Sequence, residues 1–349
     1  MKISYMLRRE DFYSINQKTL DKYYKEKHKS KTLYIYPHLN AIVTRTPSKR
    51  VKQYLYVEYS HNASLIKHFL TKMYTRIYIN SFGLLSSSRC RVNGDFSDNS
   101  LIYPCNKKIR IFDFDSGTVR VVAKAGFCNT GIKKEIEFRK TNNASFIPKV
   151  LSFDDEEYTE KIIDGRPLAR IKEGQELYKE AILNLWNGYK RDSKDIAISE
   201  YAKQLREEFA VLIKKCTGKS ADFLKAHELE EHLYALLAVS SDMTQVALSH
   251  GDLQPGNVWI ENNTDNIYII DWESYGRRSV GYDYAALYRD LRKKDGISRL
   301  AKSNAILDVV ILYEDLIFKL EELSSLPEDI GSGDFDDYVN TVLREIKNV

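Results

Sequence analysis

The stretch LSHGDLQPGNVWIENNTDNIYIIDWESYG, residues 248–276, decides the fold expected for this chain. It places Asp252 in a short polar loop, Asn257 five residues later, and Asp271 directly after the apolar run IYII. Asp, Pro, Gly and Asn between apolar segments favour a tight turn. Carboxylate and amide oxygens are the donors that Mg²⁺ prefers. The stretch therefore predicts a loop and a strand end that together hold a metal ion and a reacting proton.

Phosphoryl transfer is the reaction that needs this combination of side chains. In such a reaction the protein mainly positions the reactants and neutralises charge. Asp252 would accept or orient the proton of an acceptor hydroxyl, while Asn257 and Asp271 would bind Mg²⁺. A plain turn at Asp252 and Asn257, or a strand cap at Asp271, is the bland alternative.

The composition narrows the class of protein. The chain has 349 residues, of which 43% are hydrophobic, and a net charge of only +4. Residues 1–99, however, contain 18 Lys and Arg against seven Asp and Glu. This basic region would contact an anionic partner or, as the favoured interpretation, form a merely solvated surface. No nucleic-acid partner is expected, because neither an RNA-binding signature nor a DNA-reading helix is present.

Location and membrane attachment are also constrained. No apolar run is long enough for a membrane span, and the start MKISYMLRRED lacks the pattern of a secretory signal. The four cysteines are too scattered for a zinc site or a disulfide framework. We therefore expect reduced thiols and a cytoplasmic protein.

The pattern of apolar residues predicts three regions. Residues 1–95 form an N-terminal α/β accessory region with strands expected at 31–44 and 75–85 and short helices at 48–59 and 64–74. Residues 96–163 form a β-rich lobe, with strands expected at 100–104, 108–115 and 118–126, a helix at 131–141 and two strands within 146–165. Residues 164–349 are mostly helical, because apolar residues recur at spacings of three and four.

The two motifs HGDLQPGN and IIDWE resemble the signatures of the aminoglycoside phosphotransferase and choline kinase family, relatives of the protein kinases. The matching residues are His250, Asp252, Asn257, Asp271 and Glu273. Gln254 departs from the His that many members carry, but it leaves the ligand positions intact. The resemblance covers about residues 97–325 and implies a protein-kinase-like two-lobe α+β fold, with a small β-rich lobe and a larger helical lobe.

The same resemblance implies roles for residues nearer the N-terminus. Lys124, in VRVVAK, would hold the α- and β-phosphates and pair with Glu135, or less favourably with Glu137. The segment CNKK stands where the phosphate-covering loop belongs. Glu160 to Ile163, including Ile162, would line the adenine at the hinge. The cofactors would be ATP, with GTP possible, and Mg²⁺.

Three neighbours of the motif are interpreted as structural. These are His250, supporting the loop through hydrogen bonds, Trp272, packing in the core, and Asp283, anchoring the loop after the metal site. The decoy TGKS at 217–220 is rejected, because Ile213 stands where a phosphate-binding loop needs Gly.

The sequence thus predicts an enzyme, an ATP- and Mg²⁺-dependent phosphotransferase acting on a hydroxyl of a small acceptor such as a sugar, an aminoglycoside or an amino alcohol. Two alternatives remain open. One is a protein Ser/Thr kinase recruited through the basic N-terminal region, although no Asp-Phe-Gly or Ala-Pro-Glu is present. The other is an inactive kinase-like binding module.

Overall fold

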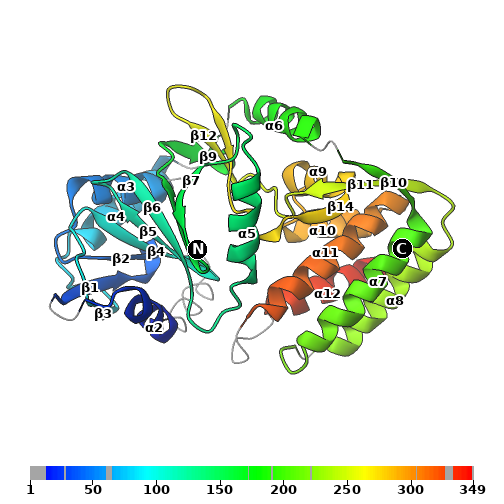
Figure 1. Ribbon diagram of the computed structural model, residues 1–349, viewed down its shortest axis with the longest axis horizontal. Helices are drawn as coiled ribbons and strands as arrows, with labels where there is room; N and C mark the ends of the chain where they lie inside the picture. Colours follow the sequence, from blue (N-terminus) through cyan, green and yellow to red (C-terminus); the bar gives the residue numbers. More distant parts are fainter. Residues whose placement is uncertain are drawn as a thin grey trace. The chain divides into compact units, whose positions relative to one another are not determined.

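The computed structural model of the chain describes eight stretches that together cover most of the sequence (Figure 1): residues 13–26, 29–59, 65–171, 173–189, 192–220, 222–303, 305–326 and 333–347. The start of the chain, to which the expectation about a secretory signal refers, lies outside the described residues. Two compact units are present. Residues 1–140 and 148–163 make up the β-rich unit, and residues 141–147 and 164–349 make up the helical unit.

The β-rich unit is built on one antiparallel sheet of eight strands, in the order β3-β1-β2-β4-β5-β6-β8-β7. Its elements are α2 (Tyr13–Tyr23), β1 (Lys31–Tyr36), η1 (Pro37–Leu39), β2 (Ala41–Val43), α3 (Lys49–Tyr59), α4 (Leu65–Ile79), β3 (Ser88–Val92), β4 (Ser100–Pro104), β5 (Lys108–Asp113), β6 (Thr118–Ala123), α5 (Thr130–Thr141), β7 (Val150–Phe153) and β8 (Glu157–Lys161).

Both faces of this sheet are buried, which follows from the alternation of side chains along a strand. In β1, Leu33 and Ile35 pack in a core that includes Leu20 of α2. Tyr34 and Tyr36 point to the other face and pack with residues of α3, α4 and α5. A strand that is buried on both faces has a continuous run of apolar residues in the sequence, as LYIY at residues 33–36 shows.

The sheet crosses the boundary predicted near residue 95. Strand β2 pairs with β4, with Ile42 opposite Ile102. The described residues before residue 95 therefore share one sheet with the strands of residues 96–163, and only residues 141–147 of that region belong to the helical unit. Strand periodicity does not show which strands pair, so this continuity was not visible in the sequence.

One predicted strand is wrong. The sequence favoured a strand over residues 75–85, but α4 continues to Ile79 and a turn follows. The β-branched and aromatic residues suggested a strand. Thr75, Tyr78 and Ile79 are nevertheless buried at a spacing of three and four, so packing against the core favours a helix. The strand predicted over residues 31–44 is in fact two, because the turn η1 at Pro37–Leu39 reverses the chain and β1 pairs with β2 in antiparallel fashion. The remaining predicted strands and helices lie where elements of those types are found.

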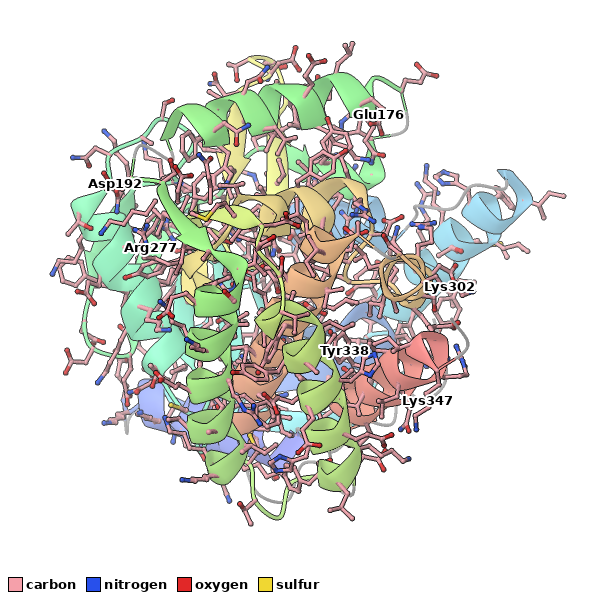
Figure 2. The ribbon with its side chains drawn as sticks, turned by 90° about the vertical axis from the view of Figure 1, so that its right-hand side faces the viewer. Glu176, Asp192, Arg277, Lys302, Tyr338 and Lys347 are labelled. Atoms are coloured by element: carbon pink, nitrogen blue, oxygen red, sulfur yellow. The ribbon has the colours of Figure 1, made fainter. Side chains whose placement is uncertain are left out.

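The helical unit combines two small antiparallel sheets with a bundle of long helices. Figure 2 looks onto it, with α7 and α8 as the two long green helices that pack side by side. Its elements are β9 (Gly165–Pro167), η2 (Leu168–Arg170), α6 (Gln175–Tyr189), β10 (Lys194–Ala197), α7 (Ile198–Lys215), α8 (Phe223–Ala238), β11 (Met243–Ser249), β12 (Val258–Glu261), β13 (Ile267–Ile269), η3 (Trp272–Ser274), β14 (Gly276–Ser279), α9 (Val280–Tyr288), α10 (Lys294–Ala301), α11 (Ile306–Ser324) and α12 (Gly333–Ile346).

The small sheets position the motif. One sheet has the strand order β10-β11-β14 and the other β13-β12-β9. The loop 250–257 connects β11 of the first sheet to β12 of the second, while the segment 270–275 connects β13 back to β14. The α+β fold class predicted from the sequence is confirmed. Within the described part of the chain, no helix combines the length and the apolar character that crossing a bilayer requires.

Candidate functional site

The loop that carries Asp252 is fixed at its start by a buried carboxylate, Asp283 of α9. Asp283 accepts hydrogen bonds from Ser249 Oγ at 2.9 Å, from the backbone N of His250 at 3.1 Å and from that of Gly251 at 3.3 Å. The indole nitrogen of Trp186 donates a further bond to it at 2.7 Å. Asp283 thus has a structural role, as interpreted, but these bonds anchor the loop that begins at His250 and not the loop after the metal site.

Gly251 allows the chain to turn here. Its φ is +82°, in the region that favours glycine. A Cβ at this position would lie 2.1 Å from the carbonyl oxygen of Ser274 and 2.7 Å from Nη1 of Arg278. Any side chain would therefore push the loop away from η3, on the segment that follows Asp271.

His250 links the loop to the end of β13. Its Nδ1 accepts a hydrogen bond from the backbone N of Asp252 at 3.2 Å. The proton of the neutral ring must then be on Nε2, which donates to the carbonyl oxygen of Ile270 at 3.1 Å. Complete burial lowers the pKa of the imidazole. His250 is thus a neutral structural residue, packed against the Trp272 ring with centroids 4.5 Å apart.

Both carboxylate oxygens of Asp252 accept hydrogen bonds from neighbouring side chains. Oδ1 accepts from Nε of Arg292 at 2.7 Å. Oδ2 accepts from Nε2 of Gln254 and from Nδ2 of Asn257, each at 2.9 Å. The side chain keeps 19% of its surface exposed, so the carboxylate is oriented but remains accessible. Fixed orientation and access are what a general base requires.

Arg292, which follows α9, orients the Asp252 carboxylate, and the sequence did not reveal this role. Besides Asp252, it donates to the carbonyl oxygen of Gly251 at 2.7 Å, to Tyr282 Oη at 3.0 Å and to Asp315 Oδ1 of α11. Its guanidinium lies 3.8 Å from the ring centroid of Phe318. The planar fork of an arginine suits such a set of acceptors. In the sequence it is one basic residue within RDLRKK, and nothing in the local pattern distinguishes it.

A backbone hydrogen bond joins Asn257 to the residue before Asp271. The Asn257 carbonyl oxygen accepts a hydrogen bond at 2.9 Å from the backbone N of Ile270, the neighbour of Asp271. Val258 pairs with Ile269 in the adjoining strands. Asp271 itself has φ +70° and ψ +55°, a left-handed conformation that is uncommon for a residue other than glycine. Such strained residues cluster at ligand-binding sites.

The donor set fits Mg²⁺. Nδ2 of Asn257 donates to the carbonyl and the carboxylate of Asp252, which leaves its Oδ1 outside these two bonds. A carboxylate follows at Asp271. Mg²⁺ is usually held by one or two protein donors, several waters and phosphate oxygens, and not by a full protein cage. No cluster of three His, Cys, Asp or Glu side chains suited to a metal is found in the described ranges.

The β-rich unit contains the other four residues predicted for the site. Lys124 follows directly after β6 and is buried, and this burial lowers the pKa of its ammonium group to about 8. A buried amine of this kind gains from a phosphate partner, because the added negative charge favours its protonated form. Ile162 is partly buried against the core, and its backbone N donates to Gly117 at 2.9 Å.

Glu135 and Glu160 belong to a buried network centred on Arg139 of α5. Nη2 of Arg139 lies 2.7 Å from Oε2 of Glu160, and its Nη1 lies 3.4 Å from Oε1 of Glu135. Tyr158 donates to Glu135 at 3.0 Å, and Lys108 Nζ lies 3.3 Å from its other oxygen. The sequence predicted neither Arg139 nor Lys108 as a partner of these two carboxylates.

The structure places five of the seven predicted residues in two groups. Asp252, Asn257 and Asp271 surround one loop and strand end of the helical unit. Glu135 and Glu160 share Arg139 in the β-rich unit, which also contains Lys124 and Ile162. The first group was recognisable because its members lie within 20 residues of one another. The partners in the second group lie on separate strands and a helix.

A comparison with protein-family models agrees with the motif. Residues 176–292 match the family model described as choline/ethanolamine kinase. Similar solved structures include the choline kinase of Cryptosporidium parvum Iowa II, at 14% identity over 72% of this chain and 90% of that one, with a TM-score of 0.44. The ethanolamine kinase of Plasmodium vivax is 12% identical over 88% of this chain and 95% of that one, with a TM-score of 0.43.

A third similar structure is a thermostable mutant of the aminoglycoside phosphotransferase APH(4)-Ia, in ternary complex with AMP-PNP and hygromycin B. It is 14% identical over 71% of this chain and 93% of that one, with a TM-score of 0.47. No curated protein sequence matches the chain significantly. The resemblance predicted from HGDLQPGN and IIDWE is confirmed, and the matched segment contains Asp252, Asn257 and Asp271.

Proposed function

We propose that this protein is an Mg²⁺-dependent phosphotransferase that moves the γ-phosphoryl group of ATP to a hydroxyl of a small acceptor. The observation that carries the proposal is the fixed Asp252 carboxylate, bonded to Asn257 and Arg292 within the segment matched by the choline/ethanolamine kinase model. A base held in this way before substrate arrives reduces the reorganisation that the reaction requires.

Each residue has a role in this proposal. Asp252 orients the acceptor hydroxyl and takes up its proton as the oxygen attacks the γ-phosphorus. Asn257 Oδ1 and the Asp271 carboxylate would hold Mg²⁺, which neutralises charge on the phosphate oxygens when bound. Lys124 would contact the non-transferred phosphates. Glu135, which lies on α5, would fix the position of that helix. Glu160 and Ile162 would border the base of the nucleotide.

The role of Glu160 in nucleotide binding is narrower than the sequence suggested. The carboxylate of Glu160 is bound to Arg139, so its contribution to nucleotide binding would come from the backbone of β8. Backbone N–H and C=O groups distinguish the adenine of ATP from the guanine of GTP by the order of hydrogen-bond donors and acceptors that they offer. We propose ATP as the donor, with GTP as the alternative. The four cysteines are thiols, which suits the cytoplasmic location expected for an enzyme that uses ATP.

For the acceptor we propose three chemical classes and not a single compound. An amino alcohol, a sugar and an aminoglycoside all offer the hydroxyl that Asp252 would activate. The test is transfer of labelled γ-phosphate from ATP to a panel of these three classes, with and without EDTA, and with GTP as a parallel donor. Label should appear on at least one small acceptor and vanish with EDTA. Label on no acceptor, or only on added proteins such as casein, would reject the proposal.

A further inference from the structure

The most unusual surface of the molecule is apolar and lies on α4 and the turn after it. Of the 22 large apolar side chains that are exposed among the described residues, nine lie between residues 66 and 85. On α4 these are Ile66, Phe69, Leu70, Met73, Tyr74 and Ile77. Ile66 is 73% exposed and Phe69 is 64% exposed. Exposed apolar groups in such a concentration mark an interaction surface.

Helix geometry gathers most of these residues into one stripe, made of Ile66, Phe69, Leu70, Met73 and Ile77. At about 100° per residue, the spacings of three, four and seven return to the same face. The opposite face is the one that packs, since Thr75, Tyr78 and Ile79 are buried there. The stripe is thus unnecessary for attaching α4 to its own unit.

The helix is firmly attached by that packed face. The Tyr78 ring meets the Tyr36 ring edge-on, with centroids 5.0 Å apart. At the end of the helix, Asn80 donates to Tyr56 Oη of α3 at 2.9 Å. The stripe is consequently presented to solvent by an ordered support.

The turn after α4 adds three apolar side chains, Phe82, Leu84 and Leu85. Phe82 has φ +51°, which is an outlier for a bulky residue, yet its ring is exposed. Hydrogen bonds hold the turn: Gly83 N donates to Tyr36 Oη at 3.1 Å, and Leu84 N donates to Ser81 O at 2.9 Å. Residues held in such a conformation cluster at functional segments.

The sequence around this surface carries almost only positive charge. Residues 45–91 contain nine Lys and Arg but a single acidic residue, Glu58. Within α4 there is no Asp or Glu. Lys72 and Arg76 are exposed, and by their helical position they lie along the flank of the stripe beside Phe69. Pairing α4 with a second copy of itself would bring these cations together, which disfavours a self-complementary dimer.

We propose that the apolar stripe of α4, together with the turn at Phe82, Leu84 and Leu85, binds the surface of an anionic lipid membrane. An apolar helix face bordered by Lys and Arg is the pattern of helices that lie in the membrane interface. The apolar side chains enter the boundary of headgroups and acyl chains, and the cations attract the acidic headgroups. This inference is independent of the proposed phosphotransferase activity.

The test uses the full-length chain and sedimentation with vesicles of phosphatidylcholine, with or without phosphatidylserine. We expect binding to the phosphatidylserine vesicles, weak binding to phosphatidylcholine alone, and loss of binding as salt is raised. The triple variant Ile66→Ser, Phe69→Ser and Ile77→Ser should bind at least about tenfold more weakly, since it removes apolar area that enters the interface.

Matched controls distinguish binding through this surface from nonspecific binding by any exposed apolar or basic residue. The variant Leu177→Ser, Leu224→Ser and Val239→Ser removes three apolar side chains of the helical unit that are at least as exposed as those on α4, and it should bind as the unchanged protein does. Lys72→Gln with Arg76→Gln should weaken binding only to the anionic vesicles. Lys214→Gln with Lys215→Gln, an exposed pair on α7, should have no effect. Thermal melting of each variant verifies that it is folded.

Three results would overturn the proposal. The unchanged protein could fail to bind phosphatidylserine vesicles, or the α4 triple variant could bind them as well as the unchanged protein. The third is a dimer, seen by light scattering, that the α4 variant converts to a monomer while neither form binds vesicles. That outcome would assign the stripe to a second copy. Phe69→Trp offers an independent readout, since its emission should shift to the blue on the anionic vesicles only.

Discussion

Two arginines of this molecule, Arg139, which is buried, and Arg292, which is mostly buried, each lie between two carboxylates. The difference between them separates a structural network from a candidate reaction centre. Arg139 in the β-rich unit bonds Glu160 and Glu135, and their side chains are at most 10% exposed. Arg292 in the helical unit bonds Asp315, which is fully buried, and Asp252, which is 19% exposed. Both clusters desolvate charge, but only the second leaves a carboxylate accessible to a substrate.

The comparison teaches that buried charge is a poor marker of a site by itself. A buried ion pair adds little net stability, yet breaking it by removing one partner is costly. Both arginines should therefore matter for folding. Only the arginine that orients an accessible carboxylate should also matter for turnover after its effect on folding has been taken into account.

The largest expected effect is that of Arg139→Leu on stability. It would leave the buried carboxylates of Glu135 and Glu160 without their shared partner and should lower the free energy of unfolding by about 3–5 kcal/mol. Urea unfolding measures this. Arg120→Leu is the matched control, because Arg120 and Glu157 form a half-exposed pair whose loss should cost about 1 kcal/mol or less. Equal losses in the two variants would contradict the buried network.

Removal of the proposed metal ligands comes next. Asp271→Ala should weaken the affinity for Mg²⁺ with nucleotide by about 10²-fold or more, which exceeds the loss typical of outer-shell partners. Asn257→Ala should act in the same direction but less, because a neutral amide contributes less than a carboxylate. Calorimetric titration with and without Mg²⁺ gives both values. Unchanged affinity in Asp271→Ala would remove this residue from the site.

Arg292→Lys sharpens the contrast between the two arginines. The charge remains, but a lysine lacks the fork that bonds Asp252, Gly251 and Asp315 together. We expect kcat to fall by about 10²-fold, because a small displacement of a catalytic group has that effect, while the KM for nucleotide stays nearly constant. The conservative Arg139→Lys should change stability more than kcat. A similar kcat loss in both variants would contradict the distinction.

The smallest expected effect concerns Lys124 and pH. Its pKa is lowered to about 8 by burial, from 10.5 in an unfolded chain. Between these two values the unfolded chain binds a proton that the folded protein does not, so this group makes stability rise with pH over about pH 8–10.5. Lys124→Met should lack this rise, and the change between pH 8 and 9.5 is at most about 2 kcal/mol. Parallel melting curves for both proteins across that range would contradict the burial of Lys124.

Much of the helical site could be predicted because its chemistry is local in sequence. The loop 250–257 and the end of β13 supply Asp252, Asn257 and Asp271 within one stretch, so their types and spacing were visible. The partners that orient them come from farther away. Arg292 and Asp315 follow on a later loop and helix, and their roles depend on how α9 and α11 pack.

The β-rich unit shows where sequence reasoning ends. The individual strands β4, β5 and β6 were visible from alternating apolar residues, but their partnership with β1 and β2 was not. Residues 75–79 had strand-like composition, and packing of Tyr78 and Ile79 on the core made them helical. Contacts between distant segments decided both outcomes, and a single sequence contains no direct signal of such contacts.

The central claim is that Asp252 acts on the acceptor hydroxyl and is not needed for folding or nucleotide binding. The most direct test is kcat of Asp252→Asn with the acceptor found in the labelled-phosphate panel, alongside calorimetry with Mg²⁺ and nucleotide. Asp242→Asn, an exposed acid between α8 and β11, is the matched control. We predict a kcat loss of about 10²–10⁴-fold with nucleotide affinity and melting temperature close to those of the unchanged protein. A kcat within about tenfold of the unchanged protein would contradict the claim.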